Sequence, residues 1–214
     1  EEPCISGKKG SGAVFFSDCS MSCVFCQNFE ISQRHNGKEV SVEHLADIYL
    51  SLQKKGAGNI NLVSPTHYMP QAAEAVLLAR GRGLHIPVLY NTNGFENTDT
   101  LKLLEGIIDI YLPDLKYFSD GYAVRYSNAK GYFGYASSAI LEMYRQTGPN
   151  IFAGGMLKKG IIIRHLLLPG LLSDSKRIID WICANLPHDI YVSLMCQYVP
   201  MYNAKKYHAE DLRK

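Results

Sequence analysis

Short apolar runs alternate with longer amphipathic segments along most of the chain. The runs have the length of buried strands, and the segments between them place apolar residues at helical spacing. Six strands are predicted, at residues 13–17, 60–63, 86–90, 108–112, 161–168 and 190–194. The predicted helices lie between them, at about 42–55, 71–80, 98–105, 138–146 and 173–185.

The spacing between strands suits right-handed crossovers, so we expect a parallel sheet. Ser41 is a suitable N-cap for the helix that follows it, and Gly56 ends that helix. Residues 117–136 are rich in tyrosine and glycine, and their pattern predicts neither a helix nor a strand clearly. The pattern contains no repeat or linker and predicts a single domain over 1–214. Because the first residue is not methionine, this domain is expected to be either whole or truncated at one end. A six-stranded partial barrel and a flat doubly wound sheet both satisfy this order.

The composition is that of an ordinary globular protein. The chain has 214 residues, of which 47% are hydrophobic and 20% charged, enough for one sizeable core. Its net charge of +2 favours neither a nucleic-acid nor a membrane partner, and no apolar run approaches the roughly 20 residues of a membrane span. Three of its six cysteines are clustered, which fits a reducing compartment better than a disulfide framework and predicts a cytoplasmic location.

Cys19, Cys23 and Cys26 stand in a C-x3-C-x2-C arrangement just after the first predicted strand. Three thiolates so close in sequence can converge on one metal centre. A structural zinc site needs a fourth ligand, for which Cys4 or a histidine is available. An iron–sulfur cubane usually takes four cysteines, so three close ligands without an evident fourth predict a [4Fe–4S] cluster with one iron open for chemistry. The remaining cysteines are interpreted as ordinary thiols: Cys4, Cys183 and Cys196.

This arrangement, with the aromatic Phe25 directly before its last cysteine, resembles the signature of the radical S-adenosylmethionine (SAM) superfamily. The segment Cys26-Gln27-Asn28 is similar to the one that follows the signature in pyruvate formate-lyase activating enzymes. The resemblance implies a (β/α)6 partial barrel, and a [4Fe–4S] cluster whose open iron is chelated by the amino and carboxylate groups of SAM. The strings that resemble an uncharacterised branch of activating-enzyme homologues are Pro65-Thr66-His67-Tyr68 and Tyr111-Leu112-Pro113-Asp114.

Polar residues follow the predicted strands at their carboxyl ends, where the active sites of α/β barrels lie. Asp114-Leu115-Lys116 is similar to a stretch whose lysine faces SAM in the activating enzymes, although a solvated salt bridge is the alternative. Arg164 stands inside a buried strand and needs an anionic partner, either the SAM carboxylate or Asp114. Structural alternatives are core packing for Phe25, a surface position for His67 and an ordinary turn for Asn93. The candidate cofactor-binding residues are Phe25, Asn28, Ser64, Thr66, His67, Asn91, Asn93, Asp114, Lys116, Arg164 and Gln197, and no catalytic residue is assigned.

Three positions depart from the activating-enzyme pattern. Ser64-Pro65-Thr66-His67 stands where the family has a Gly-Gly-Glu stretch that binds the SAM amino group. Backbone carbonyls and the Thr66 hydroxyl would bind that amino group here instead. Asn91 replaces an aspartate that binds a monovalent cation together with the residue matched by Asp114, which makes the cation an optional cofactor here. Gln197 stands where a family histidine contacts the ribose.

The resemblance implies that the reduced cluster cleaves SAM to a 5′-deoxyadenosyl radical, which abstracts hydrogen from a glycine of a partner glycyl radical enzyme. A flavodoxin or ferredoxin-type protein would supply the electron. Residues 27–41 contain no cysteine, unlike the insert of activases with extra clusters. Two other classes stay open: a radical SAM enzyme acting on a small molecule or another macromolecule, and a zinc-binding interaction module.

Overall fold

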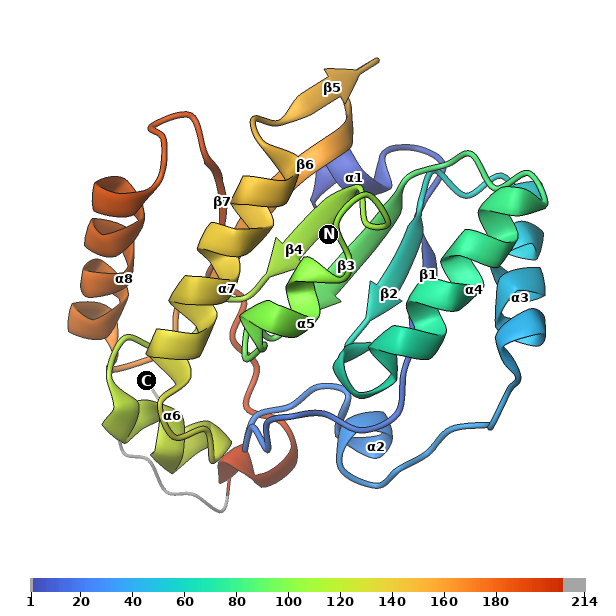
Figure 1. The fold of residues 1–214 in the computed structure, drawn as a ribbon. Helices are drawn as coiled ribbons and strands as arrows, with labels where there is room; N and C mark the ends of the chain where they lie inside the picture. The colour runs from blue at the N-terminus through green and yellow to red at the C-terminus, as the bar shows by residue number, and fades with distance from the viewer. Residues whose placement is uncertain (1, 206–214) are drawn as a thin grey trace.

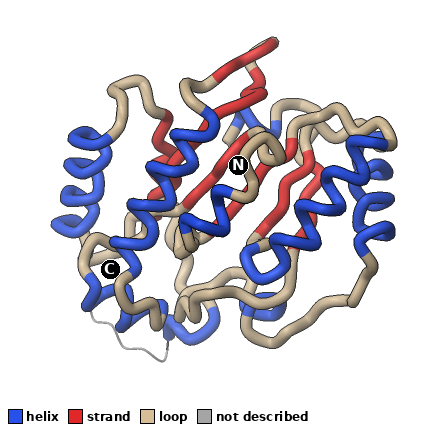
Figure 2. Tube along the Cα trace, in the orientation of Figure 1, coloured by secondary structure: helices blue, strands red, loops and turns tan. Residues whose placement is uncertain are grey.

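Six parallel strands, joined by helices, form the centre of the fold (Figure 1, Figure 2). The computed structural model describes residues 2–205. Within these residues the two outermost parallel strands each pair on one side only, so the curved sheet forms a partial barrel, as predicted. In sheet order the parallel strands are β1 (Gly12–Phe15), β2 (Ile60–Val63), β3 (Val88–Thr92), β4 (Ile110–Pro113), β6 (Met156–Leu166) and β7 (Tyr191–Met195), and β5 (Ile151–Ala153) pairs antiparallel with β6.

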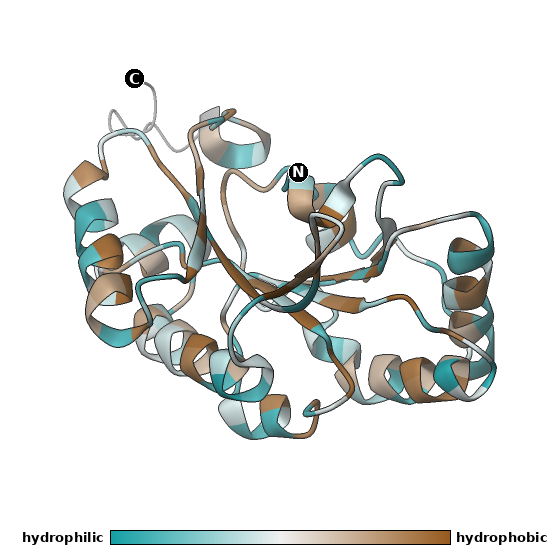
Figure 3. Ribbon diagram, turned by 90° about the horizontal axis from the view of Figure 1, so that it is seen from above, coloured by the Kyte–Doolittle hydropathy of each residue, from teal (hydrophilic) through white to brown (hydrophobic). Residues whose placement is uncertain are grey.

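The crossover helices cover one face of the sheet, which Figure 3 shows from above. The first of them, α3 (Val42–Lys54), begins after Ser41 as predicted, and the Ser41 hydroxyl oxygen accepts a hydrogen bond from His44 N at 3.2 Å. The others are α4 (Met69–Gly81), α5 (Thr98–Lys102), α7 (Tyr132–Thr147) and α8 (Leu172–Asn185). Shorter elements are α1 (Pro3–Ser6), α2 (Phe29–Ser32), α6 (Asp120–Ser127) and the 3-10 turns Thr66–Tyr68 and Tyr202–Lys205.

Strand side chains alternate between the helix-covered face and the inner face of the barrel. Tyr90 and Tyr111 point to the helices and belong to the main core. Leu89 and Ile110 point inward and pack with Ile5 of α1, which lies against the first half of β6. The same period of two keeps three polar residues on the inner face further toward the carboxyl ends of the strands: Asn91, Asp114 and Arg164.

Two regions differ from the sequence-based expectation. The strand expected at 161–168 is the second half of an 11-residue β6, whose first half pairs with β5 through a turn at Gly154 and Gly155, both at positive φ. Residues 117–136 contain α6 and the start of α7, because the burial of Tyr132 and Ala136 stabilises a helix that local composition does not favour.

The helix expected at 98–105 ends earlier, at Lys102. None of the helices in residues 2–205 combines the length and the apolar character that crossing a bilayer requires. The single domain over 1–214 stays a prediction, and residue 1 and residues 206–214 of that range lie outside the described residues.

Candidate active site at the carboxyl ends of the strands

The three clustered cysteines lie in the loop that follows β1 and runs along the carboxyl ends of the strands (Figure 1). Two backbone hydrogen bonds fasten this loop to the last turn of α6. Ser22 N donates to Ser127 O, and Val24 N donates to Tyr126 O, each at 2.9 Å. A helix that the sequence pattern does not reveal therefore holds the cysteine loop in place.

Each of the three sulfurs has a polar side chain against it. Hydroxyl and amide groups of this kind orient and tune thiolate ligands of metal centres, and a set of thiolates suits an iron–sulfur cluster. The residues present therefore fit the predicted cluster. The pairs are Asn93 Nδ2 donating to Cys19 Sγ at 3.2 Å, Ser127 Oγ donating to Cys23 Sγ at 3.0 Å, and Cys26 Sγ with Ser32 Oγ at 3.2 Å.

The other cysteines lie apart from this loop. Cys4 belongs to α1, which packs against β6 and the inner core, whereas Cys183 and Cys196 are exposed. In residues 2–205 no three cysteine, histidine, aspartate or glutamate side chains converge on one position for a single ion. A cubane does not require such convergence, because its cysteines bind separate irons.

Burial disfavours the charged form of two of these thiols. It raises the pKa of Cys19 and raises that of Cys23 to about 11, although the positive charge of Lys116 opposes both shifts. Metal binding requires thiolates, so loading of the site would release protons.

Asp114 is the centre of a nearly buried charged group. Lys116 Nζ donates to Asp114 Oδ2 at 2.5 Å, and Arg164 Nη2 lies 2.8 Å from Asp114 Oδ1. Burial would raise the pKa of Asp114, but the charges of Arg164 and Lys116 outweigh it and lower that pKa. The carboxylate thus stays ionised, and the group of three carries one excess positive charge.

Arg164 on β6 also reaches past β4 to β3, because its Nη2 donates to Asn91 Oδ1 at 2.7 Å. Asp114, one of the two partners expected for this arginine, contacts it, and its contact with the SAM carboxylate stays a prediction. The guanidinium group therefore lies between Asn91 and Asp114, the two residues matched to the cation site of the activating enzymes. A positive charge of the chain itself occupies this position.

The Asn93-Gly94 turn brings β3 and β4 into close contact. Gly94 has a φ of +83°, and a Cβ there would lie 2.2 Å from Asp114 O, so only glycine fits. The Tyr132 hydroxyl lies 2.8 Å from Asn93 O and 2.9 Å from Asp114 O, and it accepts a hydrogen bond from Lys116 N at 2.9 Å. Tyr132 belongs to the tyrosine-rich stretch, where composition alone does not single it out.

The buried carboxylate of Glu96 accepts a hydrogen bond from the candidate Thr66. One oxygen of Glu96 accepts hydrogen bonds from Thr66 Oγ1 at 2.7 Å, from Tyr90 Oη at 3.0 Å and from the hydroxyl of Thr92. Burial raises the pKa of Glu96, and these hydrogen bonds partly offset the rise. Sequence reasoning missed Glu96, because nothing in the local pattern shows that three hydroxyl groups converge on it.

The remaining candidates differ in exposure. The side chains of Asn28, His67 and Gln197 are exposed, and their contact with SAM stays a prediction. Ser64 has a positive φ of 55°, a strained conformation for a residue other than glycine, and strain of this kind is frequent at functional sites. Phe25 is buried in the main core and meets the ring of Tyr198 edge-on at 6.0 Å, and its contact with adenine stays a prediction.

Three buried polar atoms near this rim have no hydrogen-bond partner in residues 2–205: Arg164 Nε, Tyr198 Oη, and Asp114 Oδ1, which is held only by the ion pair with Arg164. Buried donors are normally satisfied, so an orphaned one points to a ligand or a water. Arg164 Nε is a donor for an anion, and Tyr198 Oη lies on the ring that contacts Phe25. Both atoms could bond to a polar ligand.

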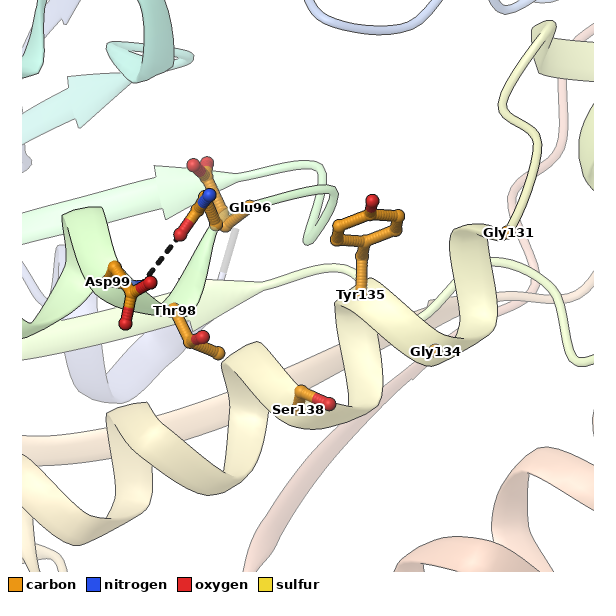
Figure 4. Close-up of a pocket in the computed structure, with 8 residues that line it drawn as sticks. Glu96, Thr98, Asp99, Gly131, Gly134, Tyr135 and Ser138 are labelled. Carbon is orange, nitrogen blue, oxygen red and sulfur yellow. Dashed lines mark hydrogen bonds between the residues drawn. The ribbon is translucent and has the colours of Figure 1, made fainter.

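A pocket of about 340 Å³ lies on the helix side of the rim, between the start of α5 and the start of α7 (Figure 4). Tyr135 rises from α7 on one side, and Glu96 lies opposite, next to α5. Glu96 separates this pocket from Thr66, and none of the candidate cofactor-binding residues lines it.

Comparison with known proteins gives the family. The sequence matches the radical SAM superfamily over residues 14–182, which include all three cysteines. The chain belongs to the radical SAM superfamily. Enzymes of this family use SAM and a [4Fe–4S] cluster, so the match favours these cofactors over the zinc-binding interaction module.

Individual relatives add less about the reaction. An uncharacterised protein of Methanocaldococcus jannaschii is 30% identical over 207 residues, covering 92% of this chain and 56% of that protein. Streptococcus suis SuiB bound to its precursor peptide SuiA has a TM-score of 0.62 at 12% identity, over 91% of this chain and 44% of SuiB. The hydrogenase maturase HydG has a TM-score of 0.58 at 13% identity, and the match covers 90% of this chain and 44% of HydG. The chain thus spans about half the length of these proteins, and the solved structures share its fold.

Proposed function

We propose that Cys19, Cys23 and Cys26 hold a [4Fe–4S] cluster and that the protein, with SAM beside it, takes a hydrogen atom from a glycine of a partner glycyl radical enzyme. When bound, the cluster supplies the electron that breaks the C5′–S bond of SAM, giving methionine and the 5′-deoxyadenosyl radical that accepts the hydrogen atom. The observation that carries the proposal is the hydrogen-bonded link between the thiols and the Asp114–Lys116–Arg164 group: Asn93 donates to Cys19 Sγ, and Tyr132 joins Asn93 O to Lys116 N.

The charged group is suited to the carboxylate of SAM. Its excess positive charge attracts an anion, and hydrogen bonds to an ionised acceptor are stronger than neutral ones. Arg164 Nε is a buried donor without a partner in residues 2–205, and we assign it, with Lys116 Nζ, to that carboxylate. The SAM carboxylate would then complete the charge balance that Asp114 alone leaves open.

The other ends of SAM need different groups. The amino group requires acceptors, which we assign to the carbonyls of residues 64–66 and to Thr66 Oγ1, whose own proton is donated to Glu96. The adenosine moiety is assigned to the aromatic pair Phe25 and Tyr198, with the Tyr198 hydroxyl as a donor or acceptor. The contact between these two rings holds the loop after β7 against the cysteine loop.

A polypeptide substrate is supported by the open sides of the barrel. Phe15, at the carboxyl end of β1, is 50% exposed and stands on the inner side of a strand that has one free edge within residues 2–205. The motifs at Asn93-Gly94 and Asp114-Leu115-Lys116 resemble those of the activating enzymes. Among proteins of the same fold, SuiB binds its precursor peptide SuiA, which is an analogy at the level of the fold only.

The experiment is anaerobic reconstitution with iron and sulfide, followed by reduction in the presence of SAM. The electron would come from dithionite or from a flavodoxin or ferredoxin-type donor. We expect 5′-deoxyadenosine, and in the presence of a glycyl radical enzyme from the same source we expect the doublet EPR signal of a glycyl radical. Cys23→Ala should abolish both products, whereas Cys183→Ala should leave both unchanged. Deoxyadenosine without a doublet for any partner would assign the enzyme to a small molecule or another macromolecule.

A further inference from the structure

A chain of two hydroxyl groups leads from the protein interior to one of the cluster cysteines. Tyr117 Oη lies 2.7 Å from Ser127 Oγ, and Ser127 Oγ donates to Cys23 Sγ at 3.0 Å. A serine hydroxyl has one proton, so a Ser127 that donates to sulfur must receive the proton of Tyr117. The direction is therefore fixed as Tyr117 to Ser127 to Cys23.

The chain is shielded from water and locked to the cysteine loop. Tyr117 and Ser127 are both fully buried. The carbonyl of Ser127 also accepts the hydrogen bond from Ser22 N, so backbone and side chain hold the same part of the loop. Burial raises the pKa of Tyr117 well above its ordinary value, which keeps the phenol protonated and able to donate.

The contacts of the other two cysteines are different in kind. Asn93 Nδ2 is shared between Cys19 Sγ and Ser20 Oγ. Ser32 and Cys26 are both partly buried, and either group of that pair can donate. Cys23 is thus the ligand whose sulfur receives a hydrogen bond of fixed direction from a fully buried serine, which in turn accepts one from a buried tyrosine.

We propose that Tyr117 and Ser127 set the reduction potential of the cluster through this relay to Cys23. Reduction adds negative charge to the cluster and its sulfurs, so a donor to sulfur stabilises the reduced form more than the oxidised form. In buried surroundings of low dielectric, the hydrogen bond from Tyr117 to Ser127 polarises the Ser127 hydroxyl and so strengthens its hydrogen bond to Cys23. Both are positioning residues, and the inference rests on the cluster of the proposed function.

The test is an EPR-monitored redox titration of the reconstituted protein, with iron content measured in parallel. Ser127→Ala should lower the ratio of reduced to oxidised cluster at a fixed potential by about tenfold, equal to about 59 mV for a one-electron couple. Tyr117→Phe should lower the same ratio by a smaller factor. Tyr111→Phe is the matched control, because its hydroxyl donates to Gln146 Oε1 at 2.6 Å on the helix-covered face, and it should cause no shift.

The possible outcomes are distinct. Unchanged potentials in Ser127→Ala and Tyr117→Phe, with iron content equal to wild type, would overturn the relay and leave the proposed function intact. If Ser127→Ala fails to retain iron, Tyr117→Phe decides alone, since it removes one oxygen and keeps the ring: a shift supports the relay and no shift overturns it. A wild-type protein that holds no cluster would overturn the proposed function itself, and the relay with it.

Discussion

Arg164 and Asp114 form an ion pair of 2.8 Å that joins β6 to the end of β4. The same guanidinium group donates to Asn91 at the end of β3. One side chain thus links three neighbouring strands at the rim, and its remaining buried donor, Nε, is unsatisfied in residues 2–205. A purely structural arginine would have no use for that donor, which is why we assign it to SAM.

Removal of the Arg164 guanidinium should weaken SAM binding. We expect Arg164→Leu to reduce the binding free energy of SAM by about 1.5–3 kcal/mol, the range for a hydrogen bond to a charged group, measured by calorimetry on the reconstituted protein. Arg80→Leu removes the Arg80–Asp109 pair, which lies at the amino end of β4, and should leave SAM affinity unchanged. Unchanged SAM affinity in Arg164→Leu, together with a collapse of thermal stability, would identify Arg164 as a structural ion-pair residue.

The position of Arg164 also predicts independence from monovalent cations. Because the guanidinium already lies between Asn91 and Asp114, wild-type SAM cleavage should be equal in sodium, potassium and tetramethylammonium salts of the same ionic strength. The double variant Asn91→Asp, Arg164→Leu exchanges the fixed cation for a second carboxylate, and its cleavage rate should depend on sodium or potassium. Stimulation of the wild-type enzyme by either ion would show that a separate cation site exists.

Much of the fold follows from the sequence because its strands are short apolar runs between turns. Ile60–Val63 is found at its expected residues. The next strand lies two residues later than expected, at Val88–Thr92, because polar Asn91 and Thr92 continue it and find partners in Arg164 and Glu96. Hydrophobicity alone ends a strand too early wherever its last residues belong to a polar site.

The candidate site is predictable only in part, and for a similar reason. The cysteines, Asp114 and Lys116 stand in short motifs. Ser127 and Glu96 do not, since their function depends on contacts with residues distant in sequence: Ser127 and Cys23 are 104 residues apart. No local period or spacing encodes such a contact, so a structure is required to find it.

The three clustered cysteines should account for all the cluster ligands that the protein supplies. Single replacement of Cys19, Cys23 or Cys26 by alanine should abolish the reducible [4Fe–4S] signal, which in wild type should correspond to close to four irons per chain. The matched replacements Cys4→Ala, Cys183→Ala and Cys196→Ala should retain iron and EPR signal, because these thiols lie outside the loop. Loss of the cluster in Cys4→Ala would mean a fully ligated centre without an open iron.

Glu96 should make the folded protein less stable as the pH rises. Burial raises its folded-state pKa above the ordinary value of 4.5, so between these two values the folded state holds a proton that the unfolded state has released. Stability then falls as the pH rises through 4.5 and levels off above the folded-state pKa. The three hydroxyl donors, and the charge of His67, reduce this effect without reversing it.

The measurement is the free energy of unfolding of wild type and Glu96→Gln by urea between pH 4 and pH 8. The amide oxygen of glutamine can accept the same hydroxyl hydrogen bonds, so the variant should gain stability relative to wild type as the pH rises. Glu105→Gln is the control of opposite sign, because the contact with Arg145 lowers the pKa of Glu105 and its contribution is lost as the pH falls. Parallel curves for wild type and Glu96→Gln across this range would show that the Glu96 carboxyl titrates with the same pKa in the folded and unfolded states.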